Sequence, residues 1–225
     1  MNLILIRHGE SVWNKENKFT GWTDVGLSSK GIDEAIEAGK FLKEHNIVYD
    51  KAYTSVLKRA IDTLYYVMRE NHEVSVTKAW QLNERHYGAL QGLNKDEMRA
   101  KYGEEKVHEW RRSYKTKPPM LEKDDERYPG NIHLYDDVPR DLLPLSESLE
   151  DTVNRVMPYY EEHIKKDLDA GQNILIVAHG NSLRALIKYI DNISDEDIPN
   201  LELPTGKPIL YKYENGIYTK VDNFN

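Results

Sequence analysis

Short apolar runs alternate along the chain with longer segments in which apolar residues recur every three or four positions. Residues 3–6 are apolar and are cut off by charged and glycine residues, which is the pattern of a buried strand. Residues 173–178 repeat this pattern, and shorter strands are expected around 50–54 and 74–79. Because helical segments separate these runs, the order predicts an α/β fold with a mainly parallel central sheet and helices on both faces.

Four segments have apolar positions at helical spacing. The first follows Ser28 and the second begins at Ser55, where each serine is suited to cap a helix. A third helix is expected after Ser146 or Ser148, and a fourth over residues 182–190. These helices supply the layers that a parallel sheet needs on its two faces.

The remaining segments are less regular. Residues 81–112 show no clear period, and residues 113–145 hold five of the nine prolines, so we interpret the latter as a surface excursion and not as a linker between domains. Pro158 lies inside the third helical pattern and predicts a kink or a split there. Asn215-Gly216 separates two strand-like runs and predicts a β-hairpin.

Composition narrows the class of protein. The 225 residues are 39% hydrophobic and 31% charged, as expected for one globular domain over residues 1–225. The net charge of -7 argues against nucleic acid or an anionic membrane as a partner. Cysteine is absent, which excludes disulfides, thiolate metal sites and a cysteine nucleophile. The N-terminal apolar run is shorter than the ~7–15 residues of a signal-peptide core, and no run approaches the ~20 of a membrane span, so we expect a cytoplasmic protein.

Two strand–His–Gly units give the first indication of function. Arg7, His8 and Gly9 follow the first long strand, and His179 and Gly180 follow the other. Ligands of open α/β sheets bind at the carboxyl ends of the strands, where these residues would meet. Backbone N–H groups near the two glycines, and the start of the helix after the second one, would bind an anion. The pattern therefore favours phosphate chemistry, with His8 as a nucleophile that carries the phosphoryl group.

Arginines and carboxylates elsewhere are candidates for the same site. Arg59, Arg111 and Arg112 could supply bidentate donors to a phosphoryl group, but on spacing alone each could equally be a surface charge. Residues 95–117 hold eight Lys or Arg against five Asp or Glu, so this stretch is basic in an acidic protein. Glu84 could move the proton of a substrate hydroxyl, although nothing in its local sequence separates it from other carboxylates.

Other well-known site patterns are absent from the sequence. Residues 180–184 lack the second glycine of a nucleophile elbow, and there is neither a P-loop nor a GxGxxG motif. Two histidines without cysteine or a repeated carboxylate pattern make a weak metal site, so no metal is expected.

Several longer motifs give a sharper indication. They are RHGESVWNKENKFTGWTDVGLS, TSVLKRAIDTL, LNERHYGALQGLNK, WRRSY, KDDERYPG and AHGNSLRALIKYID, and the resemblance that they carry spans about residues 2–215. The start of the first, with the strand before it, resembles the signature of the histidine phosphatase superfamily. The whole set resembles the cofactor-dependent phosphoglycerate mutases of that superfamily, and LNERHYGALQG is far more specific than a bare RHG.

The resemblance implies roles for individual positions. His8 would be the phosphorylated nucleophile, His179 would bind the transferring group, and Glu84 would donate and accept the substrate proton. The implied phosphate-pocket positions are Arg7, Ser11, Asn14, Thr20, Gly21, Arg59, Gly180 and Asn181, and those that hold the rest of the substrate are Arg85, His86, Tyr87, Lys95, Arg111 and Arg112.

The resemblance also implies a reaction. It is the glycolytic and gluconeogenic interconversion of 2- and 3-phosphoglycerate, an isomerase reaction through a phosphohistidine on His8 that 2,3-bisphosphoglycerate primes. The implied partner is a small polyanion with a carboxylate and up to two phosphates, bound by arginines without a metal. The implied fold is the phosphoglycerate mutase-like α/β fold in a homo-oligomer, with a dimer favoured.

Two alternatives stay open. A phosphatase of the same superfamily would share the two histidines and their neighbouring arginines, and the segments around Glu84 and Arg111 argue against it. A non-catalytic phospholigand-binding protein would lack a catalytic residue, and none is missing here. Few residues follow the predicted hairpin, and a short tail over the site would let water reach phosphorylated His8 and raise phosphatase activity.

Overall fold

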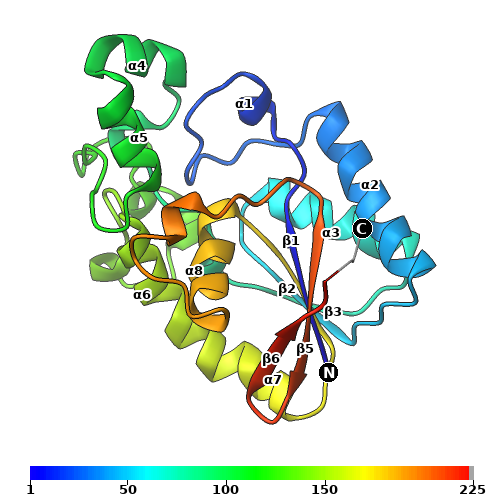
Figure 1. Cartoon of the computed structure of the whole chain (residues 1–225). Helices are drawn as coiled ribbons and strands as arrows, with labels where there is room; N and C mark the ends of the chain where they lie inside the picture. Colours follow the sequence, from blue (N-terminus) through cyan, green and yellow to red (C-terminus); the bar gives the residue numbers. More distant parts are fainter. Residues whose placement is uncertain (223–225) are drawn as a thin grey trace.

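A six-stranded sheet forms the centre of the protein, and the computed structural model describes residues 1–222 (Figure 1). The strands are β1 (Asn2–Arg7), β2 (Lys51–Thr54), β3 (Ser75–Lys78), β4 (Ile174–Ala178), β5 (Pro208–Glu214) and β6 (Ile217–Lys220). Their order is β3-β2-β4-β1-β5-β6. The first four strands in this order run parallel to one another. β5 pairs antiparallel with β1, and β6 pairs antiparallel with β5. The predicted α/β class with a mainly parallel sheet is therefore confirmed.

The central strand β1 is buried on both faces. Leu3 and Leu5 belong to the hydrophobic cluster on one face, and Ile4 and Ile6 belong to the cluster on the other. Because helices cover both faces, both sets of side chains must be apolar. This explains why β1 and β4 are continuous apolar runs in the sequence and not alternating ones.

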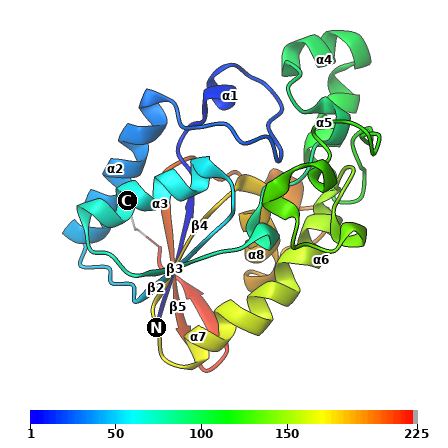
Figure 2. The same ribbon diagram turned by 180° about the vertical axis from the view of Figure 1, so that it is seen from behind.

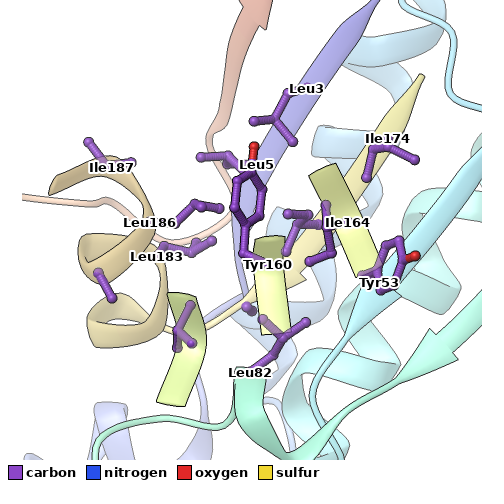
Figure 3. Packing of buried hydrophobic residues seen from close by; sticks show 14 of the residues in the cluster. Leu3, Leu5, Tyr53, Leu82, Tyr160, Ile164, Ile174, Leu183, Leu186 and Ile187 are labelled. Carbon is purple, nitrogen blue, oxygen red and sulfur yellow. The ribbon is translucent and has the colours of Figure 1, made fainter. Parts of the chain in front are cut away.

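Helices cover the two faces of the sheet in two groups. α2 (Ser29–Glu44) and α3 (Lys58–Glu70) pack together on one face. α6 (Leu149–Tyr159), α7 (Lys165–Asp169) and α8 (Gly180–Ile190) lie on the other, as the opposite views of Figures 1 and 2 show. On this second face Tyr160 and Ile164 share a cluster with Leu183 and Leu186 of α8 (Figure 3). None of the helices within residues 1–222 is long and apolar enough to cross a lipid bilayer.

Two of the predicted helix starts and the predicted split are confirmed. Ser28 caps α2, and Ser148 caps α6 in a reciprocal capping box with Asp151. A π-helical turn, η6 (Tyr160–Ile164), follows Pro158 and separates α6 from α7.

The last two strands form the predicted hairpin. β5 and β6 pair around Asn215 and Gly216, which both have positive φ, 51° and 83°. A two-residue turn of this kind needs the left-handed region at both positions, and asparagine and glycine tolerate it. The hairpin prediction is confirmed.

Two other predicted helix starts are wrong. α3 begins at Lys58 and not at Ser55, because Leu57 still has extended backbone angles. α8 begins at Gly180, two residues before the predicted start, so it follows β4 almost directly. This brings the unpaired N–H groups at the start of α8 to the carboxyl edge of the sheet.

Residues 95–112 form two helices that the sequence pattern did not predict. α4 (Lys95–Tyr102) and α5 (Glu104–Arg112) lie beyond the carboxyl ends of the parallel strands (Figures 1 and 2). They bury few residues, namely Met98, Val107 and Trp110, which is too few to give a clear helical period. These side chains pack on Phe19 and Leu90 in a small separate cluster.

The segment 113–145 has three 3-10 turns as its regular structure, η3 (Pro129–Asn131), η4 (His133–Tyr135) and η5 (Arg140–Leu142). Part of it is nevertheless packed around Trp22 of the loop that follows β1, through the buried side chains of Leu121, Tyr128, Tyr135 and Leu143. The other short elements are α1 (Val12–Lys15), η1 (Trp80–Leu82), η2 (Gly88–Leu90) and η7 (Ile198–Asn200).

Candidate active site

A cleft of about 270 Å³ opens at the carboxyl ends of β1 and β4, beside the start of α8. It brings together thirteen of the residues predicted from the sequence: Arg7, His8, Asn14, Thr20, Gly21, Arg59, Glu84, Tyr87, Lys95, Arg111, Arg112, Gly180 and Asn181. These residues come from segments far apart in the chain, so the fold is what assembles them.

His8 is held in one orientation by hydrogen bonds of its backbone and of its ring. It directly follows β1, and its backbone N–H donates to the carbonyl of Ala178 (2.9 Å). Its Nδ1 lies 2.6 Å from the carbonyl oxygen of Gly9, which can only accept, so Nδ1 carries the proton. Burial lowers the pKa of His8 well below its usual value, and the charges of Arg59 and Arg7 lower it further. The ring is therefore neutral near pH 7, with the lone pair on Nε2.

His179 lies behind His8 and does not itself line the cleft. The two ring centroids are 4.9 Å apart. Nε2 of His179 is 2.7 Å from the hydroxyl oxygen of Ser55, which also accepts the backbone N–H of Leu57. Burial and the charge of Arg59 lower the pKa of His179 well below its usual value. Ser55 is thus a contact of the second histidine and not a helix cap.

Arg59, on α3, extends its side chain to the ring of His8. It is 1% exposed, and its Nε donates to Nε2 of His8 (3.3 Å). Its two terminal nitrogens donate to the carbonyls of Gly21 (2.7 Å) and Thr23 (3.0 Å), which fixes the loop after α1 against the cleft. Burial lowers the pKa of Arg59 to about 10, so its charge persists at neutral pH. Arg59 is therefore a buried part of the cleft and not a surface charge.

Glu84 is placed by backbone donors. One carboxylate oxygen, Oε1, accepts the N–H of Arg85 (2.7 Å) and the N–H of Asn181 (3.1 Å), the latter at the start of α8. The residue is only 9% exposed and lines the cleft. A carboxylate at a helix N-terminus is electrostatically stabilised, and this one lines the same cleft as His8.

The opposite wall of the cleft is strongly basic. Lys95 begins α4, and Arg111 and Arg112 end α5. Burial, together with the charge of Arg111, lowers the pKa of Lys95 to about 8. Counting the whole lining, seven basic side chains face two carboxylates, Glu84 and Glu202. A net positive cleft in an acidic protein suits a small polyanion.

Some polar atoms around the cleft have no protein partner. Nε of Arg7, Oγ1 of Thr20 and Nη1 of Arg112 are buried and make no hydrogen bond within residues 1–222. A Cβ at Gly180 would lie 3.3 Å from Nη1 of Arg184 and 3.5 Å from Nε of Arg7, so glycine keeps the backbone open there. Unpaired guanidinium and hydroxyl donors beside an open backbone fit phosphate oxygens.

Three further predicted residues lie outside the cleft. Ser11 exchanges hydrogen bonds with Asn14 in the capping box of α1. Arg85 is buried, with its guanidinium on backbone carbonyls that include those of Glu147 (2.8 Å) and Thr116 (2.8 Å). His86 is buried against Trp22, and burial lowers its pKa to about 3. As placed, these side chains support the walls and do not face the cavity.

The cleft also contains residues that sequence reasoning missed: Lys18, Phe19, Arg184 and Glu202. Arg184 lies one turn into α8, so the helical period after Gly180 was a usable signal for it. Glu202 ion-pairs with Arg112 (2.9 Å) across a long stretch of sequence, and no local pattern marks that contact. Within residues 1–222 no group of three or more His, Asp or Glu is arranged to hold a metal ion.

The fold and the site define an α/β protein with two neighbouring neutral histidines at an arginine-rich cleft. The chain belongs to the histidine phosphatase superfamily (branch 1), which matches residues 3–222 and whose members are enzymes.

Solved structures at low sequence identity share the fold. Phosphoglycerate mutase of Bacillus anthracis is 23% identical, with a TM-score of 0.72 and coverage of 100% of this chain and 93% of the other. Mycobacterial glucosyl-3-phosphoglycerate phosphatase in complex with VO3 is 21% identical, with a TM-score of 0.73 and coverage of 98% and 96%. The alpha-ribazole phosphatase of Shigella flexneri is 22% identical, with a TM-score of 0.70 and coverage of 98% and 95%.

Proposed function

We propose that the protein interconverts 2-phosphoglycerate and 3-phosphoglycerate through a phosphohistidine on His8. The observation that carries this proposal is that one cleft has anion-binding groups on two walls. Arg7 and Arg59 line it beside His8, from β1 and α3, and Lys95, Arg111 and Arg112 line it from α4 and α5. A substrate with a carboxylate and a phosphate at its two ends would find cationic partners in either orientation.

The residues of the chain have distinct tasks in this reaction. Nε2 of His8 attacks phosphorus, the P–O bond breaks, and its electron pair goes to the leaving hydroxyl oxygen. Glu84 gives that oxygen a proton and takes it back when phosphate returns to the other hydroxyl. Arg7 and Arg59 stabilise the charge on the equatorial oxygens of the phosphoryl group.

2,3-bisphosphoglycerate would supply the phosphoryl group that primes His8. The unpaired buried donors on Arg7, Thr20 and Arg112 fit its phosphates, and Lys95 and Arg111 would hold its second anionic end. The expected cytoplasmic location and homodimer remain part of this proposal.

Hydrolysis is the second candidate, because two of the structures with the same fold are described as phosphatases. A phosphatase would use the same His8, Arg7, Arg59 and His179, with water in place of the second hydroxyl. The basic wall at Lys95 to Arg112 favours the mutase, since hydrolysis does not need a rebinding substrate.

A coupled assay separates the two functions. We expect conversion of 3-phosphoglycerate to 2-phosphoglycerate that rises on addition of 2,3-bisphosphoglycerate, and an acid-labile, base-stable phosphoadduct that His8→Ala abolishes. Phosphate release without isomerisation, independent of 2,3-bisphosphoglycerate, would make the protein a phosphatase. Absence of any adduct would favour a non-catalytic binding protein.

A further inference from the structure

Arg155, near the middle of α6, uses all of its hydrogen-bond donors close to Glu84. Its Nη1 donates to the carbonyls of Gln81 (2.7 Å) and Asn83 (3.0 Å), and its Nη2 donates to the carbonyl of Glu84 (2.8 Å). The other two donors form a fork to Glu147, at 2.6 Å from Nε to Oε1 and 2.9 Å from Nη2 to Oε2. A guanidinium has five N–H groups, so none is left over.

Glu147 extends this arrangement to the next residues of the segment. Its Oε2 also accepts the backbone N–H of His86 (2.9 Å), and its own backbone N–H donates to the carbonyl of His86 (2.8 Å). The side chains of Arg155 and Glu147 are only 9% and 5% exposed, so their ion pair is shielded from water. The pair therefore holds residues 81–86 on both sides of Glu84.

Trp22 gives the same carbonyl a second donor. The indole N–H donates to the Glu84 carbonyl, and the guanidinium of Arg155 lies 5.4 Å from the centre of the indole ring. Within residues 1–222, the hydrogen bonds of the Glu84 carboxylate come from the backbone N–H groups of Arg85 and Asn181. A shift of the backbone at this position would therefore move the carboxylate directly relative to the cleft.

We propose that Arg155, paired with Glu147, is a positioning residue for proton transfer by Glu84. The inference rests on the proposed function only for the role of Glu84. It concerns the step in which His8 forms the P–N bond and the leaving oxygen takes its proton from Glu84. A misplacement of about 1 Å in such a group can cost on the order of 10²-fold in rate.

The test is Arg155→Lys, which keeps the charge but leaves at most three donors and no fork. It compares phosphorylation of His8 by 2,3-bisphosphoglycerate with phosphorylation by p-nitrophenyl phosphate, whose stabilised leaving group needs no proton. We expect a single-turnover rate about 10- to 100-fold lower with 2,3-bisphosphoglycerate, and a change within about twofold with p-nitrophenyl phosphate. Equal losses with both classes of ester would overturn the proposal, because general damage to the site affects both.

A double-mutant cycle gives a second, independent readout. In a Glu84→Gln background there is no proton transfer left to position, so Arg155→Lys should cause little further loss. If Arg155→Lys lowered the rate by the same factor in the wild-type and Glu84→Gln proteins, the proposal would be contradicted. A wild-type protein that forms no phosphohistidine with any ester would instead refute the proposed function.

Two more variants control for folding. Arg127 also forks to a carboxylate, Asp125, and donates to the carbonyl of Gln91 (2.9 Å), so Arg127→Lys makes the same change on a neighbouring segment. We expect no substrate-selective loss from it. Trp22→Phe removes the other donor to the Glu84 carbonyl and should give a smaller loss with the same selectivity, which keeps the test valid if Arg155→Lys unfolds.

Discussion

Histidines in this protein occupy very different electrostatic environments. His8 and His179 are buried beside Arg59 and Arg7, and both effects disfavour a charged imidazole. His133 is fully exposed and hydrogen-bonded to Asp136, which raises its pKa. The same type of side chain is therefore a buried neutral imidazole in one place and an easily protonated surface group in another.

This contrast predicts the titration of individual histidines in the free protein. As the pH falls from about 8 through 6.5, the usual value, His133 should protonate before His8 and His179. His8 and His179 should stay neutral over the same range, because their lowered pKa values postpone protonation to lower pH. Nitrogen chemical shifts of the imidazoles, assigned with His8→Ala and His179→Ala, measure this. A midpoint near 6.5 for His8 would contradict the burial argument.

Single residues also show where sequence reasoning succeeds. Arg7, His8 and His179 could be predicted as site residues because they stand at the ends of apolar strands. The carboxyl ends of parallel strands lie at one edge of the sheet, which is where ligands bind. Glu84 could not be separated from other carboxylates, because its placement depends on Asn181 and Arg155, which are distant in sequence. It was singled out through a resemblance of whole motifs.

At the scale of elements, the accuracy of a prediction depends on how much apolar surface the element buries. β1 and β4 are buried on both faces and were predicted nearly to the residue. α4 and α5 bury only three side chains between them and were missed. The start of α3 was misplaced because Ser55 has the residue type of a helix cap, while its hydroxyl binds His179 instead.

The small hydrophobic cluster that supports α5 predicts that a mutation there weakens substrate binding without slowing the chemical step. Val107 is fully buried there, one turn before Arg111 and Arg112. Val107→Ala should reduce the free energy of unfolding by roughly 1.5 kcal/mol and loosen the basic wall. We expect the KM for 3-phosphoglycerate to rise between about threefold and tenfold, with the isomerisation rate at saturating 3-phosphoglycerate nearly unchanged.

Val67→Ala is the matched control, since Val67 is equally buried in α3 on the far side of the sheet core. It should lose similar stability, measured by denaturant unfolding, and leave KM unchanged. A rise in KM for both variants would mean that stability, and not the position of α5, controls binding.

At the scale of the whole molecule, charge is distributed unevenly. The protein has a net charge of -7, yet its cleft is lined by seven basic side chains and two carboxylates. Long-range repulsion of an anionic substrate by the surface therefore opposes short-range attraction by the cleft. Attraction should dominate close to the site, where the walls exclude solvent.

This balance predicts a dependence on salt. Between ionic strengths of about 0.01 M and 0.15 M the Debye length falls from about 30 Å to about 8 Å. The KM for 3-phosphoglycerate should rise over this range, and Arg112→Gln should weaken the dependence by removing one cation. Initial rates at several KCl concentrations measure both. A KM that falls with added salt would show that repulsion by the acidic surface dominates.

The place of β1 in the sheet has a consequence for the newly made chain. Its neighbours are β4 and β5, so Leu3 to Ile6 have no strand partner until residues 174–214 have been synthesised. Such distant pairing is slow to form and leaves apolar segments exposed meanwhile. His8 is attached to the carboxyl end of this strand and bonds to Ala178 at the end of β4. His8 can therefore reach its position in the cleft only after most of the protein has left the ribosome.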